Sequence, residues 1–234
     1  MMPKRLAKII NEINTILLPK VCFGCNTQLS RGEHILCTVC RHDMPLTDHN
    51  FDDENAADRI FYGRIPIKKA ASFVFFSKNG MVKTLLHWLK YKKQEHIGSF
   101  LGEWCGALIE KEKSLETVDV VIPVPLHSKK QKKRGYNQVA LFAQKIAESI
   151  KADYRDDVLV RTTNTKTQTK KDRLLRWENT QKAFALNPNT KMRFKHILLV
   201  DDVITTGATI ESCAKVLFKL EKVSVSVLSI AMVP

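Results

Sequence analysis

The sequence predicts an α/β protein with a mainly parallel sheet flanked by helices, preceded by a small module that contains four cysteines. Two observations lead to this prediction. Short apolar runs of strand length alternate along the chain with longer stretches of helical periodicity, which is typical of parallel sheets. Two C-x-x-C pairs stand close together near the N-terminus, ahead of that alternating pattern.

The composition is that of a soluble globular protein with an excess of cations. The chain has 234 residues, 44% of them hydrophobic, which suffices for one α/β domain and a small addition. Lys and Arg number 38 against 24 Asp and Glu, and the net charge of +14 favours nucleic acid, pyrophosphate or an acidic partner as ligands. No stretch approaches the roughly 18 apolar residues of a membrane span.

Cys22, Cys25, Cys37 and Cys40 form two C-x-x-C pairs separated by eleven residues. Each pair places two thiolates on one tight turn, and four thiolates complete the tetrahedral shell of a structural zinc ion. Two disulfides are the alternative, but we expect no secretory signal, and a reducing compartment favours zinc. The module of about 25 residues is too small for a core of its own, so the metal would supply folding energy.

The predicted domain boundaries follow changes in composition along the chain. Residues 1–45 comprise an N-terminal amphipathic helix and the cysteine module, and a peripheral membrane anchor is the alternative for that helix. Residues 46–66 are acidic and irregular and are predicted to be a linker, and residues 67–234 form the α/β domain. In that domain we expect strands at 71–76, 118–124, 157–161, 197–200 and 223–232, and helices at 81–91, 97–111, 139–150 and 208–220.

The segment HILLVDDVITTGATI, residues 196–210, contains the strongest functional pattern. Asp201 and Asp202 would stand at the carboxyl end of a buried strand, where two carboxylates can accept hydrogen bonds from a vicinal diol such as ribose. The residues that follow offer hydroxyl groups, a glycine and the free N–H groups of a helix start, which suit a phosphate: Thr205, Thr206, Gly207, Ala208 and Thr209. An ordinary strand-to-helix turn is the structural alternative, and a P-loop is excluded because no Gly-Lys-Ser/Thr follows.

Two polar segments after other predicted strands are further candidates for anion binding. In PVPLHSKKQKKRGYNQ, residues 123–138, two prolines fix the chain as it leaves the sheet and a basic loop at 129–134 follows. A merely solvated charged loop is the alternative. Residues 162–184 are long, basic and poor in apolar side chains, and they predict a binding loop or lid, with a flexible excursion as the alternative.

The combination of these motifs, in this order, resembles the ComF family. The motifs are the two C-x-x-C pairs, PVPLH, RGYNQ, a T-x-x-Q segment followed by Arg176 and Asn179, and LLVDDVITTGAT. This last segment is also similar to the PRPP-binding motif of type I phosphoribosyltransferases. The family includes GntX-like proteins and is linked to natural competence. The resemblance covers nearly the whole chain and implies a bacterial cytoplasmic protein with a zinc module on a type I phosphoribosyltransferase core.

The resemblance also implies roles for individual residues. Asp201, Asp202 and Arg134 are the implied catalytic residues, and the loop from Thr205 to Thr209 is the implied site of the PRPP 5′-phosphate. Mg²⁺ would bind together with PRPP, bridging its ribose hydroxyls and pyrophosphate. The implied pyrophosphate, anion or lid residues are Pro123, Val124, Pro125, Lys133, Asn137, Gln138, Gln168 and Arg176.

Two functions are compatible with these features. A phosphoribosyltransferase would transfer phosphoribose from PRPP to an unknown acceptor and release pyrophosphate, although no side chain stands out as a general base. Alternatively, the fold would be a non-catalytic module that binds single-stranded DNA or a helicase during DNA uptake, which the net charge and the basic run favour. A glutamine-dependent amidotransferase is disfavoured because the chain begins Met1-Met2-Pro3, without a nucleophilic cysteine there. The acceptor and the oligomeric state stay open.

Overall fold

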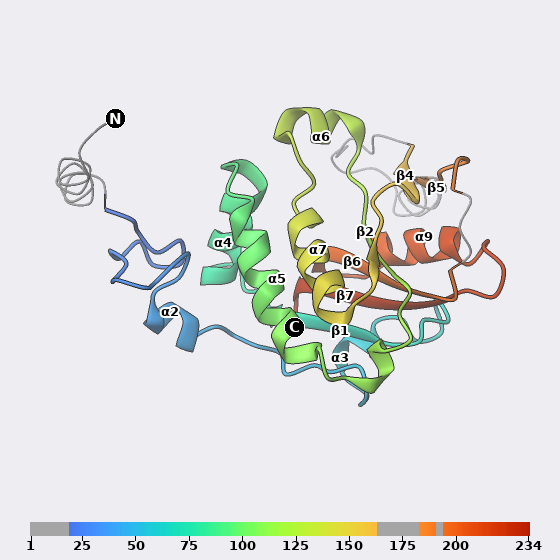
Figure 1. Ribbon diagram of the computed structural model, residues 1–234, viewed down its shortest axis with the longest axis horizontal. Coiled ribbons are helices and arrows are strands. Elements are labelled where there is room, and N and C mark those ends of the chain that lie inside the picture. Colours follow the sequence, from blue (N-terminus) through green and yellow to red (C-terminus); the bar gives the residue numbers. More distant parts are fainter. Residues whose placement is uncertain (1–18, 163–182, 191–193) are drawn as a thin grey trace, which may run out of the picture.

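A five-stranded parallel sheet forms the centre of the molecule. The computed structural model describes residues 19–162, 183–190 and 194–234 (Figure 1). The strand order is β1-β7-β6-β2-β3, and every neighbouring pair is parallel. Strands β4 and β5 form a separate antiparallel pair. The prediction of a mainly parallel sheet flanked by helices is therefore confirmed.

The elements agree with the predicted ranges to within a few residues in most places. The strands are β1 (Ala70–Phe75), β2 (Val120–Pro123), β3 (Asp153–Tyr154), β4 (Leu159–Arg161), β5 (Phe184–Leu186), β6 (His196–Ile204) and β7 (Ser224–Met232). The helices are α2 (Thr38–His42), α3 (Ala56–Arg59), α4 (Met81–Tyr91), α5 (His96–Ile109), the short 3-10 helix η1 (Lys113–Leu115), α6 (Ser128–Arg134), α7 (Ala140–Ile150) and α9 (Ala208–Leu217).

Both faces of the sheet are covered, which explains why β2 and the first half of β6 are nearly continuous apolar runs. Along β6, Leu198 and Val200 pack into a core with α4, α5 and α7. Ile197 and Leu199 point to the other face and pack with α3 and α9. Helices α5 and α7 run side by side on the first face (Figure 1). Two apolar layers thus fix β6, the strand that carries the acidic pair.

The segment 46–66, predicted to be a linker, is folded against the sheet. It contains α3, and Phe51 and Phe61 are both fully buried. The buried Asp58 carboxylate accepts a hydrogen bond from the backbone N–H of Ala70, the first residue of β1, at 2.7 Å. One of the acidic residues that suggested a solvated linker therefore attaches the segment to the sheet. The domain boundaries themselves stay predictions.

The basic run at 129–134 forms helix α6 and not the predicted loop. Lysine, glutamine and arginine are good helix formers, so the charge that suggested a loop is compatible with a helix. The His127 side chain caps the helix by accepting a hydrogen bond from the Lys129 N–H at 3.1 Å. Gly135, with φ of 90°, ends the helix in the left-handed conformation. The run therefore presents its cations from an ordered surface helix.

Some expectations concern parts of the chain that the structure does not cover. The predicted N-terminal helix at residues 1–18 and most of the predicted lid, including Gln168, Arg176 and Asn179, lie outside the described residues. Among the described residues, no helix combines the length and the apolar character needed to cross a membrane.

Candidate functional site

The acidic pair lies within the last part of β6, because the strand extends through Ile204 and does not end at Val200 as predicted. On one side, β7 pairs with β6 as far as Ile204. On the other side, the β2 ladder ends where Pro123 pairs with Val200, immediately before Asp201. After Pro123, the Val124 N–H still donates to the Val200 carbonyl at 2.8 Å, and Pro125, which has no N–H to donate, follows. Asp201 and Asp202 consequently stand where the sheet opens.

Three side chains from other elements connect to Asp202. Lys90 Nζ, in the last turn of α4, lies 2.7 Å from Asp202 Oδ2, and Gln138 Nε2 donates to the same oxygen at 2.8 Å. Arg134, the last residue of α6, donates in turn to Gln138 Oε1. The structure therefore brings together Arg134, Gln138 and Asp202, all predicted site residues. It adds Lys90, which we did not predict.

The two carboxyl groups of the pair differ in environment. Asp201 is buried, with 8% of its surface exposed, and its Oδ1 accepts a hydrogen bond from the Asp202 N–H at 2.8 Å. Burial, followed by the negative charge of Asp202, raises the pKa of Asp201 to about 8. Near neutral pH Asp201 is thus largely protonated, and a bound cation or diol would favour its ionisation.

The acidic pair lines a pocket of about 250 Å³, which we call the acid pocket. Its volume is just below the roughly 300–1,000 Å³ of common ligand sites. Four cationic side chains line the same pocket: Lys90, Lys130, Arg134 and Arg161. A ligand with both hydroxyl groups and a strongly anionic group would therefore find acceptors and positive charge within one cavity.

The loop from Thr205 to Thr209 lines a second cavity of about 50 Å³, at the start of α9. Gly207, with φ of 72°, is the residue before the helix, and because it has no side chain it cannot cap the first N–H groups of α9. Free N–H groups and nearby hydroxyl groups are the usual partners of a phosphate. We call the residues from Thr205 to Thr209, together with the cavity that they line, the phosphate loop. It shares Asp201, Val203 and Thr209 with the acid pocket.

Arg64, from the segment predicted to be a linker, supports the phosphate loop. Its Nη1 donates to the Thr206 carbonyl, and its Nε donates to Glu211 Oε2 at 3.0 Å. Because Glu211 is in the first turn of α9, Arg64 connects this turn to the loop. Within α9, Glu211 also pairs with Lys215 at 2.7 Å. The sequence pattern gave no signal for Arg64, because it lies 142 residues from Thr206.

Replacing Gly207 by alanine is expected to destabilise the protein by about 2–4 kcal/mol, from left-handed strain and overpacking. A Cβ at this position would lie 2.7 Å from Phe61 Cε1 and 2.9 Å from Ile60 Cγ2. Gly63→Ala is a matched control, because Gly63 has a similar φ of 68° and no heavy atom within 4 Å of the added Cβ. Urea unfolding of both variants measures the difference. Equal losses would contradict the packing of the phosphate loop against Phe61 and Ile60.

The remaining predicted anion-binding residues fall into two groups. Pro125 and Val124 line the acid pocket, and the Asn137 side chain donates to the Val124 carbonyl at 3.0 Å, which ties RGYNQ to PVPLH. Lys133, on α6, lines a neighbouring pocket. The roles of all these residues stay predictions. Tyr91 and Arg161, which also line the acid pocket, were missed because each stands outside the recognisable motifs.

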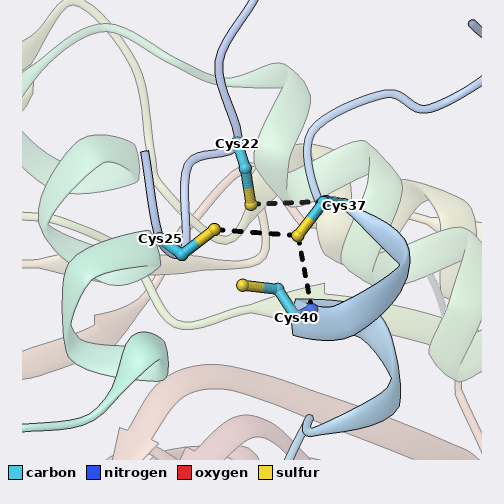
Figure 2. A group of neighbouring side chains, drawn as sticks. All are labelled: Cys22, Cys25, Cys37 and Cys40. Atoms are coloured by element: carbon cyan, nitrogen blue, oxygen red, sulfur yellow. Dashed lines mark hydrogen bonds between the residues drawn. The ribbon is translucent and has the colours of Figure 1, made fainter. Parts of the chain in front are cut away.

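The four predicted metal ligands come together in the cysteine module (Figure 2). The Sγ atoms of Cys22, Cys25, Cys37 and Cys40 lie within 4.8 Å of one another, and all four thiols are free of disulfides. Cys25 Sγ and Cys37 Sγ are 3.7 Å apart. A tetrahedral zinc ion with Zn–S bonds of about 2.3 Å separates its sulfurs by about 3.8 Å. The cluster therefore fits a structural zinc ion.

Backbone N–H groups orient the sulfurs of this cluster. The Gly24 N–H donates to Cys22 Sγ at 3.3 Å. The Cys37 N–H also donates to Cys22 Sγ at 3.3 Å, and the Cys40 N–H donates to Cys37 Sγ at 3.4 Å (Figure 2). Such bonds stabilise thiolates and hold metal ligands in place.

The cysteine module also packs on the α/β domain. The Phe23 ring lies 5.4 Å from that of Trp88 on α4 in an edge-to-face contact. The Arg41 guanidinium lies 5.0 Å from the Trp104 ring centre on α5. Cys22, Cys37 and Cys40 belong to the same core as residues of α4 and α5. The predicted metal cluster therefore stands against the helix that carries Lys90.

Several curated proteins are similar to this chain over most of its length. DNA utilization protein YhgH of Escherichia coli K12 is 25% identical over 221 residues, which cover 87% of this chain and 93% of that protein. Competence protein ComFC of Bacillus subtilis is 26% identical over 208 residues, covering 87% and 80%. Competence protein F of Haemophilus influenzae is 32% identical over 140 residues, covering 58% and 61%.

No family model matches the chain. Among solved structures, a hypoxanthine phosphoribosyltransferase from Staphylococcus aureus is similar, with a TM-score of 0.34, 15% identity, and coverage of 60% of this chain and 74% of that chain. The chain is thus a homologue of DNA utilization protein YhgH, Competence protein F and ComFC, which confirms the resemblance to the ComF family that its motifs carry.

Proposed function

We propose that the protein binds PRPP and transfers its phosphoribosyl group to an acceptor. One observation carries this proposal: the acid pocket and the phosphate loop are adjoining cavities that share Asp201 and Thr209. A sugar phosphate bound across them would place its diol at the carboxylates and its phosphate at the start of α9. The names of the homologues, DNA utilization protein and competence protein, suggest that the reaction belongs to the handling of DNA.

The residues of the acid pocket have distinct roles in this proposal. Asp201 and Asp202 accept hydrogen bonds from the ribose hydroxyls, and Lys90, Lys130 and Arg134 neutralise the pyrophosphate. Positive charge already placed at the leaving group stabilises the transition state in a site shielded from water.

Magnesium would share this pocket with PRPP. Carboxylates are the protein ligands that Mg²⁺ prefers, so Asp201 and Asp202 are the residues that would hold it or its bound water. When bound, it would supply further neutralisation of the pyrophosphate charge.

The proposed activity is tested by titration and by product analysis. Calorimetry of the purified protein with PRPP and Mg²⁺ should show one saturable site per chain. Incubation with PRPP, Mg²⁺ and a panel of bases, nucleosides, nucleotides and oligonucleotides should release pyrophosphate with one acceptor class. Absence of PRPP binding would reject the proposal, and binding without release on any acceptor would reject its catalytic part.

PRPP affinity is expected to rise with pH between about 6 and 8. Asp201 has a pKa raised to about 8, so it is largely protonated in the free protein at neutral pH. Ribose hydroxyls and Mg²⁺ favour the ionised form of Asp201, so PRPP binding releases a proton. The affinity for PRPP therefore rises by up to about tenfold for each unit of increasing pH. Calorimetry in two buffers of different ionisation enthalpy measures the proton release. The Asp201→Asn variant should release fewer protons on binding PRPP than the unmodified protein, and equal proton release by the two proteins would contradict the assignment.

A second function is favoured by α6. Its lysines are exposed, no residue of the helix is buried, and such a surface suits the backbone of single-stranded DNA or an acidic face of a helicase. Under this proposal, a labelled single strand binds with an affinity that falls steeply with salt. Replacing Lys129 and Lys132 by glutamine should reduce that slope, and an unchanged slope would reject the role of α6.

A further inference from the structure

We propose that a second pocket, between α4 and α6, binds a nucleoside phosphate, either as a free nucleotide or as a nucleotide of a single strand. We call it the basic pocket; its volume is about 250 Å³. Residues from the end of α4 and from α6 line this pocket. Helix α6 is at the top of the view in Figure 1. The cations that line it are Lys90, Lys93, Lys130, Lys133 and Arg134. Its other two lining residues are tyrosines.

The charge of the basic pocket is suited to a phosphate. It has five cations and no carboxylate among its described lining residues. Lys90 and Arg134 have partners at the acid pocket, Asp202 and Gln138. In the described part of the chain, no carboxylate pairs with Lys93, Lys130 or Lys133. Uncompensated positive charge lining a hollow attracts and concentrates an anion.

The tyrosines add a surface that a bare phosphate would not use. Tyr91 is 64% exposed, and the Arg134 guanidinium lies 5.2 Å from its ring centre. The Tyr136 hydroxyl donates to the Leu89 carbonyl, which fixes that ring at the wall of the pocket. Nucleobases stack on aromatic rings and on guanidinium planes, and such stacking tolerates any base. Cations together with ordered aromatic rings therefore favour a nucleotide over an inorganic anion.

The position of the basic pocket indicates which role such a nucleotide would have. The two pockets share Lys90, Tyr91, Lys130 and Arg134, so the two occupants would lie next to each other. A nucleotide bound there stands beside the phosphoribosyl donor, as an acceptor must. The assignment as acceptor rests on the proposed function, whereas nucleotide binding by the basic pocket does not.

Lys93 and Tyr136 line the basic pocket and not the acid pocket, which allows a selective test. In Lys93→Glu, affinity for AMP or for a labelled ten-nucleotide single strand should fall about tenfold, given a charge reversal at a phosphate. Lys83→Glu makes the same change at an exposed residue of α4 outside the pocket and should leave affinity unchanged. Tyr136→Leu should weaken binding about fivefold or more through lost stacking.

The outcomes separate this inference from the proposed function. PRPP binding, measured in the same variants, should be unchanged, which also shows that they are folded. Tight binding of AMP identifies a free nucleotide as the occupant, and binding of the strand alone identifies single-stranded nucleic acid. Failure of both ligands to bind, equal effects of Lys93→Glu and Lys83→Glu, or competition by inorganic phosphate as strong as by AMP would overturn the inference, whatever the result with PRPP.

Discussion

Replacing Asp201 and Asp202 together by asparagine is expected to abolish PRPP binding while the protein stays folded. Hydrogen bonds to charged groups contribute about 1.5–3 kcal/mol each, so loss of both carboxylates should lower the affinity for PRPP by about a hundredfold or more. Asparagine has nearly the same shape, and Gln138 can still donate to an amide oxygen at position 202. The loss would therefore reflect charge and acceptor strength. Calorimetry with PRPP and Mg²⁺ measures it.

The chain offers a matched control for this variant. Asp52 and Asp53 are also adjacent aspartates, both exposed and outside the acid pocket. Changing both to asparagine removes at least as much negative charge as the Asp201 and Asp202 variant loses, and it should leave PRPP affinity unchanged. An equal loss in the two double variants would show a general charge effect, and an unchanged affinity in the Asp201 and Asp202 variant would reject the PRPP site.

The sequence predicts those parts of the site whose residues are close together in the chain. The acidic pair, the phosphate loop and the start of α9 lie in one segment of β6 and α9, where strand burial and loop chemistry determine each residue type. The cysteine module is similar, because two short turns bring four sulfurs within 4.8 Å. Local spacing suffices in both cases because the ligands need only one or two turns of the chain.

The parts that sequence reasoning missed depend on contacts between distant segments. Lys90 reaches Asp202 only because α4 packs on the same core as β6, and Arg64 reaches Thr206 only because Phe61 packs against α9. Nothing near either cation marks it as different from other surface lysines and arginines. The basic run is a different case: its composition permitted both a loop and a helix, and the caps at His127 and Gly135 determine the helix.

Loss of zinc is expected to unfold the cysteine module. Structural zinc contributes about 10–16 kcal/mol in small zinc peptides, far more than a module of this size gains from its own apolar contacts. Cys37→Ser with Cys40→Ser should remove about one zinc per chain, measured by a colorimetric assay after denaturation. Cys105→Ser is the control, because Cys105 is buried in α5 outside the cluster and its replacement should keep the metal. Unchanged zinc content in the double variant would contradict a four-cysteine site.

The double variant Cys37→Ser with Cys40→Ser should also weaken PRPP binding, but by less than the loss of the acidic pair does. Phe23 packs on Trp88, two residues before Lys90 on α4, so an unfolded module removes a contact from the turn that positions Lys90 against Asp202. The α/β core and the phosphate loop keep their own contacts and should stay folded. We therefore expect a change in tryptophan fluorescence together with a loss of PRPP affinity of about tenfold or less, as for one weakened charged contact. Unchanged PRPP affinity in the metal-free variant would show that α4 holds Lys90 without the module.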